Sequence, residues 1–191
     1  MPRAFKVQDF RLKAYHSLLA PVRVPIPKED ATMTIKVGDT IPNTTLNYLK
    51  DGVQAINTDE IFKSKKVVLF SVPGAFTPTC SAKHLPGYVE KLAEFKKKGV
   101  DVACLAVNDA FVMGAWAKDQ KVPEDLLMLA DGNGTFSKAL GLELDGSAFG
   151  LGMRGKRFAL YAENGVIKQL HIEAPGEFKV SDAASMLNAV G

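Results

Sequence analysis

Cys80 is the residue around which the sequence gathers groups that could do chemistry. An apolar, β-branched run at residues 67–70 has the length and composition of a strand buried on both faces. Pro73 and Gly74 stop this strand, and Cys80 follows where the first turn of the next helix is expected. Free amide groups and the positive end of a helix dipole favour an anion there, so this position favours the thiolate, the nucleophilic form of cysteine.

Two further residues near the thiol, Thr77 and His84, could take part in its chemistry. The hydroxyl of Thr77 can donate and accept hydrogen bonds beside the sulfur, and Pro78 removes an N–H that the start of a helix can spare. His84 lies four residues, or one helical turn, beyond Cys80 and could tune the thiol. Each also has a structural interpretation: Cys80 as a buried structural cysteine, Thr77 as a helix cap and His84 as a surface or interface residue.

The composition predicts a single principal domain without metal-binding patterns. The chain has 191 residues, 47% of them hydrophobic, which is enough to bury one substantial core. No apolar run approaches the roughly 18 residues of a membrane span, so we expect no membrane partner. The two cysteines, at positions 80 and 104, cannot form a disulfide framework and match no zinc pattern. A reducing compartment, the cytoplasm, fits this cysteine usage best.

The net charge of +3 comes entirely from the first 32 residues. Residues 1–32 carry six basic and three acidic side chains, whereas residues 33–191 carry 18 of each. Because nucleic-acid binding needs a clustered basic face, the neutral remainder argues against it. We interpret residues 1–32 as an N-terminal extension, either a surface arm or a weak targeting segment, and residues 33–191 as the functional domain. A targeting segment would direct the protein to the mitochondrion or the plastid.

The apolar periodicity predicts an α/β chain. Expected strands at 67–70, 100–107 and 126–130 alternate with a helix after Cys80 that Pro86 interrupts and a helix at 110–118. A short helix at 136–140, a glycine-rich loop at 141–155, a hairpin of 157–162 with 166–172 and a helix at 180–190 follow. An earlier hairpin pairs 46–49 with 53–56. This order predicts a thioredoxin-like fold, with a mixed central sheet, helices on both faces and an N-terminal hairpin insertion.

Several motifs resemble those of one enzyme family. The stretch Pro-Gly-Ala-Phe-Thr-Pro-Thr-Cys-Ser at 73–81 is similar to the active-site loop of peroxiredoxins, Pro-x-x-x-Thr-x-x-Cys. The segments 83–86, 107–112 and 156–158 resemble the type II (atypical) subfamily in sequence and order. The resemblance covers residues 33–191 and leaves only 1–32 outside it.

The resemblance implies reduction of hydrogen peroxide and alkyl hydroperoxides through a sulfenic acid on the cysteine, with no metal or organic cofactor. Carried over, Cys80 is the peroxidatic cysteine, Thr77 binds the peroxide and Arg157 completes the site. Pro73, shielding the sulfur, and Gly74 would contribute to the substrate pocket. The resemblance also implies a homodimer.

Arg157 is selected by the resemblance alone. Arg154 and Lys156 lie close to it in the sequence, and alternation along a strand only sends 156 and 157 to opposite faces. A fixed cation at this place would stabilise the thiolate and donate to the peroxide oxygens as charge develops.

Cys104 lies in the middle of the buried strand expected at 100–107, where a thiol is normally inert and structural. Some peroxiredoxins keep a resolving cysteine near the C-terminus, but here no cysteine follows residue 104 and the stretch 176–182 takes its place. This departure from the family pattern leads us to expect resolution by an external thiol, either glutathione with glutaredoxin or thioredoxin.

A non-enzymatic alternative fits the same residues: a thioredoxin-like redox sensor or holdase that signals through Cys80. A thiol–disulfide oxidoreductase of thioredoxin type is disfavoured because the chain lacks Cys-x-x-Cys. Trp116 is expected in the core or at an interface rather than in catalysis.

Overall fold

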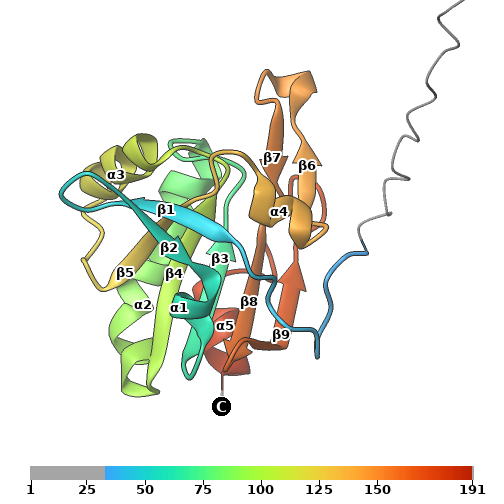
Figure 1. Cartoon of the computed structure of the whole chain (residues 1–191). Coiled ribbons are helices and arrows are strands. Elements are labelled where there is room, and N and C mark those ends of the chain that lie inside the picture. The colour runs from blue at the N-terminus through green and yellow to red at the C-terminus, as the bar shows by residue number, and fades with distance from the viewer. Residues whose placement is uncertain (1–32, 191) are drawn as a thin grey trace, which may run out of the picture. The chain divides into compact units, whose positions relative to one another are not determined.

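A seven-stranded mixed sheet forms the centre of the molecule, with strand order β2-β1-β5-β4-β3-β8-β9 (Figure 1). The computed structural model describes residues 33–190, so the predicted N-terminal extension lies outside the described residues. β3, β4 and β5 are parallel, while β8, β9 and β1 join the sheet antiparallel to their neighbours, which confirms the predicted mixed sheet. The strands are β1 Thr45–Leu49, β2 Val53–Asn57, β3 Lys66–Ser71, β4 Val100–Ala106, β5 Leu126–Ala130, β8 Phe158–Glu163 and β9 Val166–Ile172.

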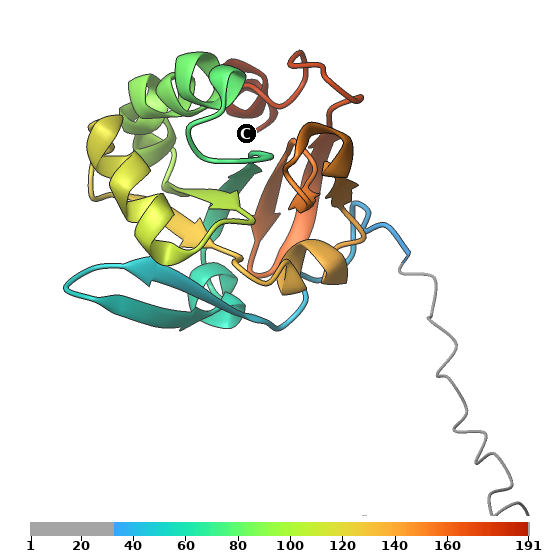
Figure 2. The same ribbon diagram turned by 90° about the horizontal axis from the view of Figure 1, so that it is seen from above.

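Helices cover both faces of this sheet, as predicted (Figure 2). The helices are α1 Thr58–Phe62, α2 Leu85–Lys97, α3 Ala110–Asp119, α4 Thr135–Ala139 and α5 Ala183–Ala189. Side chains alternate along each strand, so Phe70 and Cys104 face α2, α3 and α5, whereas Leu69 and Leu105 face α1 and α4. Residues 67–70 of β3 are all buried, as expected for a strand covered on both sides. Among residues 33–190, no helix has the length and apolar character needed to cross a bilayer.

Two predicted hairpins are present, and their turns explain their positions. β1 and β2 meet at Asp51 and Gly52, with φ angles of 52° and 106°. β8 and β9 meet at Asn164 and Gly165, with φ angles of 48° and 77°. Asn, Asp and Gly tolerate positive φ, and consecutive residues of this kind match the twist of an antiparallel pair.

Two of the predicted segments differ from the structure. Residues 141–155, expected to be a loop, contain a second small sheet in which β6 (Glu143–Asp145) pairs with β7 (Met153–Gly155). Strands of three residues are too short to show a period of two in the sequence. The last helix, expected from residue 180, begins at Ala183 because Asp182 caps it.

Candidate active site

The antiparallel pairing of β3 with β8 brings Arg157 to the thiol. Ser71, the last residue of β3, pairs with Phe158, the first residue of β8. The loop to Cys80 leaves from this end of β3, and Arg157 directly precedes β8 rather than lying within it as predicted. Both terminal nitrogens of the Arg157 guanidinium, Nη1 and Nη2, lie 3.5 Å from the Cys80 Sγ.

Cys80 lies in the first turn of a helix, as predicted, and the helix changes to π-helical geometry at this residue. Helical geometry begins at Pro78, residues Cys80–His84 form a π-helical turn and α2 continues from Leu85. The N–H of Leu85 donates to the carbonyl of Cys80. Pro86 has no N–H to continue the pattern, so the predicted interruption is a change from π-helical to α-helical geometry. The Cys80 side chain is fully buried.

Thr77 and Gly74 form the turn in front of the thiol. Thr77 Oγ1 donates its proton to the Gly74 carbonyl at 2.9 Å, which leaves the oxygen lone pairs as acceptors. A Cβ added at Gly74 would lie 3.3 Å from the Thr77 methyl group and 3.4 Å from Arg154 Nη1, so the turn has little room for a side chain. The Ala75 N–H donates to Asn108 Oδ1 at 3.0 Å, which ties the turn to the segment after β4. Pro73, half-buried, precedes this turn.

The neighbouring cations are placed differently from Arg157. Arg154 Nε donates to the Leu151 carbonyl at 2.8 Å, and its Nη1 donates to the Val107 carbonyl at 3.1 Å. Arg154 thus joins the small sheet to the end of β4, while Lys156 bonds through its backbone N–H to the Leu142 carbonyl. Of the three side chains, Arg157 is the one that contacts the sulfur.

His84 is buried, which corrects its interpretation as a helix-surface residue. Its Nε2 lies 3.0 Å from the Ser181 carbonyl, and its Nδ1 lies 3.0 Å from Arg157 Nη1. A carbonyl can only accept and a guanidinium can only donate, so Nε2 carries the proton and Nδ1 accepts from Arg157. Burial, followed by the charge of Arg157, lowers the pKa of His84 to about 4, so the imidazole is neutral at pH 7.

Two residues near the site, Phe178 and Ser181, were missed by sequence reasoning. The Ser181 carbonyl accepts from Tyr88 Oη at 2.9 Å as well as from His84. The Phe178 ring lies 4.8 Å from the His84 ring, centroid to centroid, and Arg157 Cζ lies 5.7 Å from the Phe178 centroid. The sequence offered one signal for them: the stretch 176–182 lies where some peroxiredoxins have a resolving cysteine. No motif within the stretch indicated that Phe178 or Ser181 contacts the site.

Cys104 is fully buried in β4, as predicted. Burial raises the pKa of its thiol well above the ordinary value, and the nearby Cys80 adds to this effect. Both cysteines are free thiols and belong to the same apolar cluster beneath α2. Trp116 is also in this cluster, as predicted, and its Nε1 donates to Ser81 Oγ at 3.0 Å.

Fold and site together define a thioredoxin-like protein with a buried thiol held against an arginine. A family model described as Redoxin matches residues 36–187. Peroxiredoxin-2E, chloroplastic, of Arabidopsis thaliana is 48% identical over 165 residues, which cover 83% of this chain and 70% of the relative. Peroxiredoxin-2C of Oryza sativa subsp. japonica is 47% identical over 159 residues, which cover 82% of this chain and 98% of the relative.

Solved structures agree with these relatives. Reduced Prx3 from Vibrio vulnificus in complex with hydrogen peroxide has a TM-score of 0.79 and 51% identity, covering 83% of this chain and 100% of that chain. Peroxiredoxin 5 from Alvinella pompejana has a TM-score of 0.73 and 35% identity, covering 82% and 97% of the two chains. The chain belongs to the redoxin family and, within it, to the type II peroxiredoxins. It is a thiol-dependent peroxidase, which confirms the enzymatic prediction over the alternative of a redox sensor or holdase.

Proposed function

We propose that Cys80 is the sole peroxidatic residue and that Arg157 activates it. The observation that carries this proposal is the pair of 3.5 Å contacts from the Arg157 guanidinium to the Cys80 sulfur. The Cys80 thiolate attacks one oxygen of the peroxide, the O–O bond breaks, and the other oxygen leaves with a proton as water or an alcohol. The sulfur is oxidised to a sulfenic acid, and the peroxide is reduced.

Arg157 serves two stages of this reaction. Before attack, its charge stabilises the thiolate in a buried site. During attack, its N–H groups donate to the peroxide oxygens, where negative charge develops as the O–O bond breaks. The neutral His84 accepts from Nη1 without adding a competing charge, so the guanidinium remains the positive group nearest the sulfur.

Thr77, Gly74 and Pro73 form the substrate side of the proposed site. The Thr77 hydroxyl donates its hydrogen bond to the Gly74 carbonyl, so its oxygen accepts the O–H of the incoming peroxide and holds it in line with the sulfur. Gly74 keeps the turn free of a side chain, and Pro73 shields the thiolate from solvent. Hydrogen peroxide and alkyl hydroperoxides share the O–O–H group that these contacts require.

The sulfenic acid is cleared by an external thiol in this proposal. Cys104 is fully buried, its thiol is held protonated, and no cysteine follows it in the chain. An external thiol attacks the Cys80 sulfur, releases water and forms a mixed disulfide, which a second thiol then reduces. Glutathione with glutaredoxin is the proposed reductant, with thioredoxin as the alternative, and the protein acts as a homodimer.

The compartment follows from residues 1–32. If this extension carries targeting information, the protein works in the plastid or the mitochondrion; otherwise it works in the cytoplasm. Two relatives are named as chloroplastic proteins, which supports the first possibility. A fluorescent protein fused to residues 1–32 distinguishes the two, because only a targeting segment would carry it into an organelle.

Peroxide consumption with each reductant system tests the proposal. We expect sustained turnover of hydrogen peroxide with glutathione and glutaredoxin, and none when glutaredoxin is omitted. A parallel assay with thioredoxin and its reductase decides between the two reductants. Oxidation of one equivalent of protein without turnover in either system would contradict recycling by these external thiols.

A further inference from the structure

Residues 174–181, called the strap here, connect β9 to α5 and lie against the active site. The strap supplies the Phe178 ring beside His84 and Arg157, and the Ser181 carbonyl that accepts from His84 Nε2. These contacts are with His84 and Arg157, not with the Cys80 thiol. The strap is therefore linked to Cys80 through His84 and Arg157.

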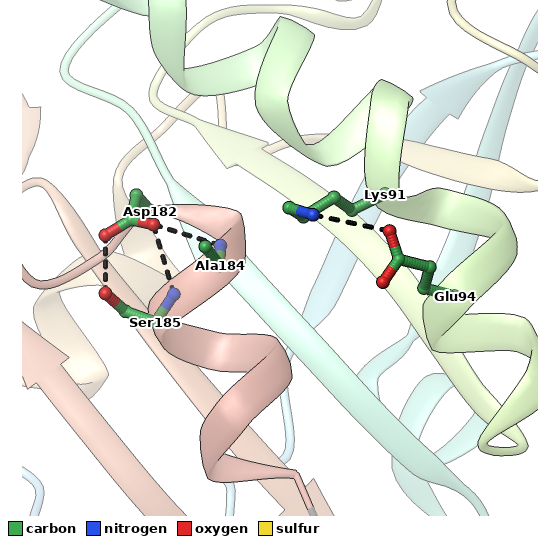
Figure 3. A network of polar contacts seen from close by, with 5 residues as sticks. All are labelled: Lys91, Glu94, Asp182, Ala184 and Ser185. Carbon is green, nitrogen blue, oxygen red and sulfur yellow. Dashed lines mark hydrogen bonds and ion pairs between the residues drawn. The ribbon is translucent and has the colours of Figure 1, made fainter.

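The C-terminal end of the strap is fixed by the start of α5 (Figure 3). Asp182 Oδ1 accepts from the N–H groups of Ala184 and Ser185 at 3.0 and 3.1 Å, and Ser185 Oγ donates to Asp182 Oδ2. This cap orients the first turn of α5 directly after Ser181. The same view also shows the Lys91–Glu94 pair of α2, a surface ion pair at 3.3 Å.

Glu173, the residue before the strap, holds its other end. Its Oε1 accepts four hydrogen bonds of 2.8 Å, from the N–H groups of Lys179, Val180 and Ser181 and from Ser181 Oγ. The residue is 8% exposed. Burial opposes the charge of this carboxyl, but the four hydrogen bonds hold its pKa below the ordinary value. Within residues 33–190 no ion pair is formed with it, so its charge is satisfied by the strap.

Glu173 is also bonded to the backbone of Arg157. Its N–H donates to the Arg157 carbonyl at 3.0 Å, which extends the pairing of β8 with β9 by one residue. The contacts thus form a closed ring: the Arg157 guanidinium to His84, His84 to Ser181, Ser181 to Glu173, and Glu173 to the Arg157 backbone.

We infer that Glu173 is a positioning residue for the peroxidase reaction, holding the strap so that His84 keeps the tautomer that accepts from Arg157. This inference rests on the proposed role of Arg157 at the thiol. If the strap moves away, His84 Nε2–H loses its carbonyl acceptor, so only the donor from Arg157 still favours the Nε2–H form and the Nδ1–H form becomes accessible. Nδ1–H would then face a guanidinium N–H, two donors without an acceptor, and the guanidinium would turn from the sulfur.

Three substitutions at Glu173 and one control test this inference. Glu173→Gln keeps a side chain of the same length with an acceptor oxygen at its end, so the strap should keep its position. Glu173→Asp keeps the charge but withdraws the oxygen by one methylene, and Glu173→Ala removes the acceptor. Glu177→Gln is the matched control, because Glu177 lies on the strap and, within the described part of the chain, its carboxylate bonds only to Lys179 Nζ.

The direct measurement is the tautomer of His84, read from the ¹⁵N shifts of its ring by NMR and assigned with His84→Gln. In the native protein, Glu173→Gln and Glu177→Gln, we expect the Nε2–H form alone at pH 7. In Glu173→Asp and Glu173→Ala, we expect a mixture with the Nδ1–H form. Native tautomer populations in both of these folded variants would overturn the inference, and Glu173→Asp decides alone if Glu173→Ala does not fold.

The second measurement is the rate constant for oxidation of the reduced protein by hydrogen peroxide. We expect Glu173→Asp and Glu173→Ala to be slower by about tenfold or more, the factor for one misplaced charged hydrogen bond, and the two Gln variants to stay within about threefold. A purely structural role would lower the unfolding temperature and leave this rate constant and the tautomer unchanged. If Arg157→Lys oxidises as fast as the native protein, the proposed function fails. If Arg157→Lys is slower but Glu173→Asp and Glu173→Ala are not, this inference alone fails.

Discussion

Arg157 Nη1 lies 3.0 Å from His84 Nδ1 and 3.5 Å from Cys80 Sγ. One nitrogen of the guanidinium thus contacts a neutral imidazole and the Cys80 sulfur together. Nη1 carries two hydrogens, so it can serve both acceptors, and Nη2 adds the second contact to the sulfur. The imidazole therefore fixes the plane of the guanidinium while the charge stays directed at Cys80.

Replacement of Cys80 by serine should abolish peroxide turnover while the fold persists. The hydroxyl keeps the shape of the side chain but does not ionise near pH 7, so it cannot replace the thiolate as nucleophile. Steady-state peroxide consumption and far-UV circular dichroism measure the two effects. Appreciable activity in this variant would exclude Cys80 as the sole peroxidatic residue.

Arg157→Lys should slow oxidation by hydrogen peroxide by about a hundredfold or more, as for loss of an oriented donor to developing negative charge. Lysine keeps the positive charge but loses the planar fork that meets the sulfur with two nitrogens. Stopped-flow oxidation of the reduced protein gives the rate constant. Lys156→Gln is the control, since it alters the adjacent cation without changing the contact with the sulfur. An unchanged rate constant in Arg157→Lys would transfer the role to Arg154 or to another residue.

The lowered pKa of His84 predicts a loss of stability on acidification. Its pKa is about 4 in the folded protein, against 6.5 for an unperturbed imidazole, because of burial and then the charge of Arg157. The hydrogen bond to Ser181 and the charges of Glu173 and Asp182 oppose this shift. Between these two values the unfolded chain binds the extra proton, so the free energy of unfolding falls as the pH is lowered from 6.5 to about 4. The expected loss is about 3 kcal/mol.

Urea unfolding between pH 4 and pH 7 measures this loss, with His84→Gln as the comparison. Carboxyl groups titrate in the wild type and in the variant alike, so the difference between the two pH profiles isolates the imidazole. The His84→Gln profile should be flatter by the stated amount. Parallel profiles for the two proteins would mean that His84 titrates with its ordinary pKa when folded.

Cys104→Ser and Cys104→Ala should retain turnover with glutathione and glutaredoxin, with a stability loss of about 1 kcal/mol. The thiol is fully buried, and burial together with Cys80 raises its pKa well above the ordinary value, so the thiolate needed to attack the sulfenic acid is scarce. After peroxide treatment without reductant, intact-mass analysis should show one oxygen added at Cys80. Addition of glutathione should convert this species to a mixed disulfide. A quantitative 80–104 disulfide with loss of turnover in the variants would instead make Cys104 the resolving residue.

The sequence by itself determined the elements whose signals are local. β3 was predicted from a short β-branched run, the helix start from Pro78 and Cys80, and the two hairpins from Asp51-Gly52 and Asn164-Gly165. These signals are local because backbone sterics and capping act over a few residues. They were sufficient for the fold class, for the place of Cys80 and for the burial of Cys104.

The spacing of residues did not determine which distant groups surround the thiol: the resemblance pointed to Arg157, and the assembled sheet decides the rest. The antiparallel register of β3 with β8 brings Arg157 to the sulfur and directs Arg154 to backbone carbonyls elsewhere. The burial and tautomer of His84 depend on Ser181, which lies 97 residues away in the sequence, and no period or spacing relates the two. Contacts of this kind are set by packing of elements that meet only when the sheet is assembled. The sequence therefore indicated Cys80 but not the groups that hold Arg157 in place.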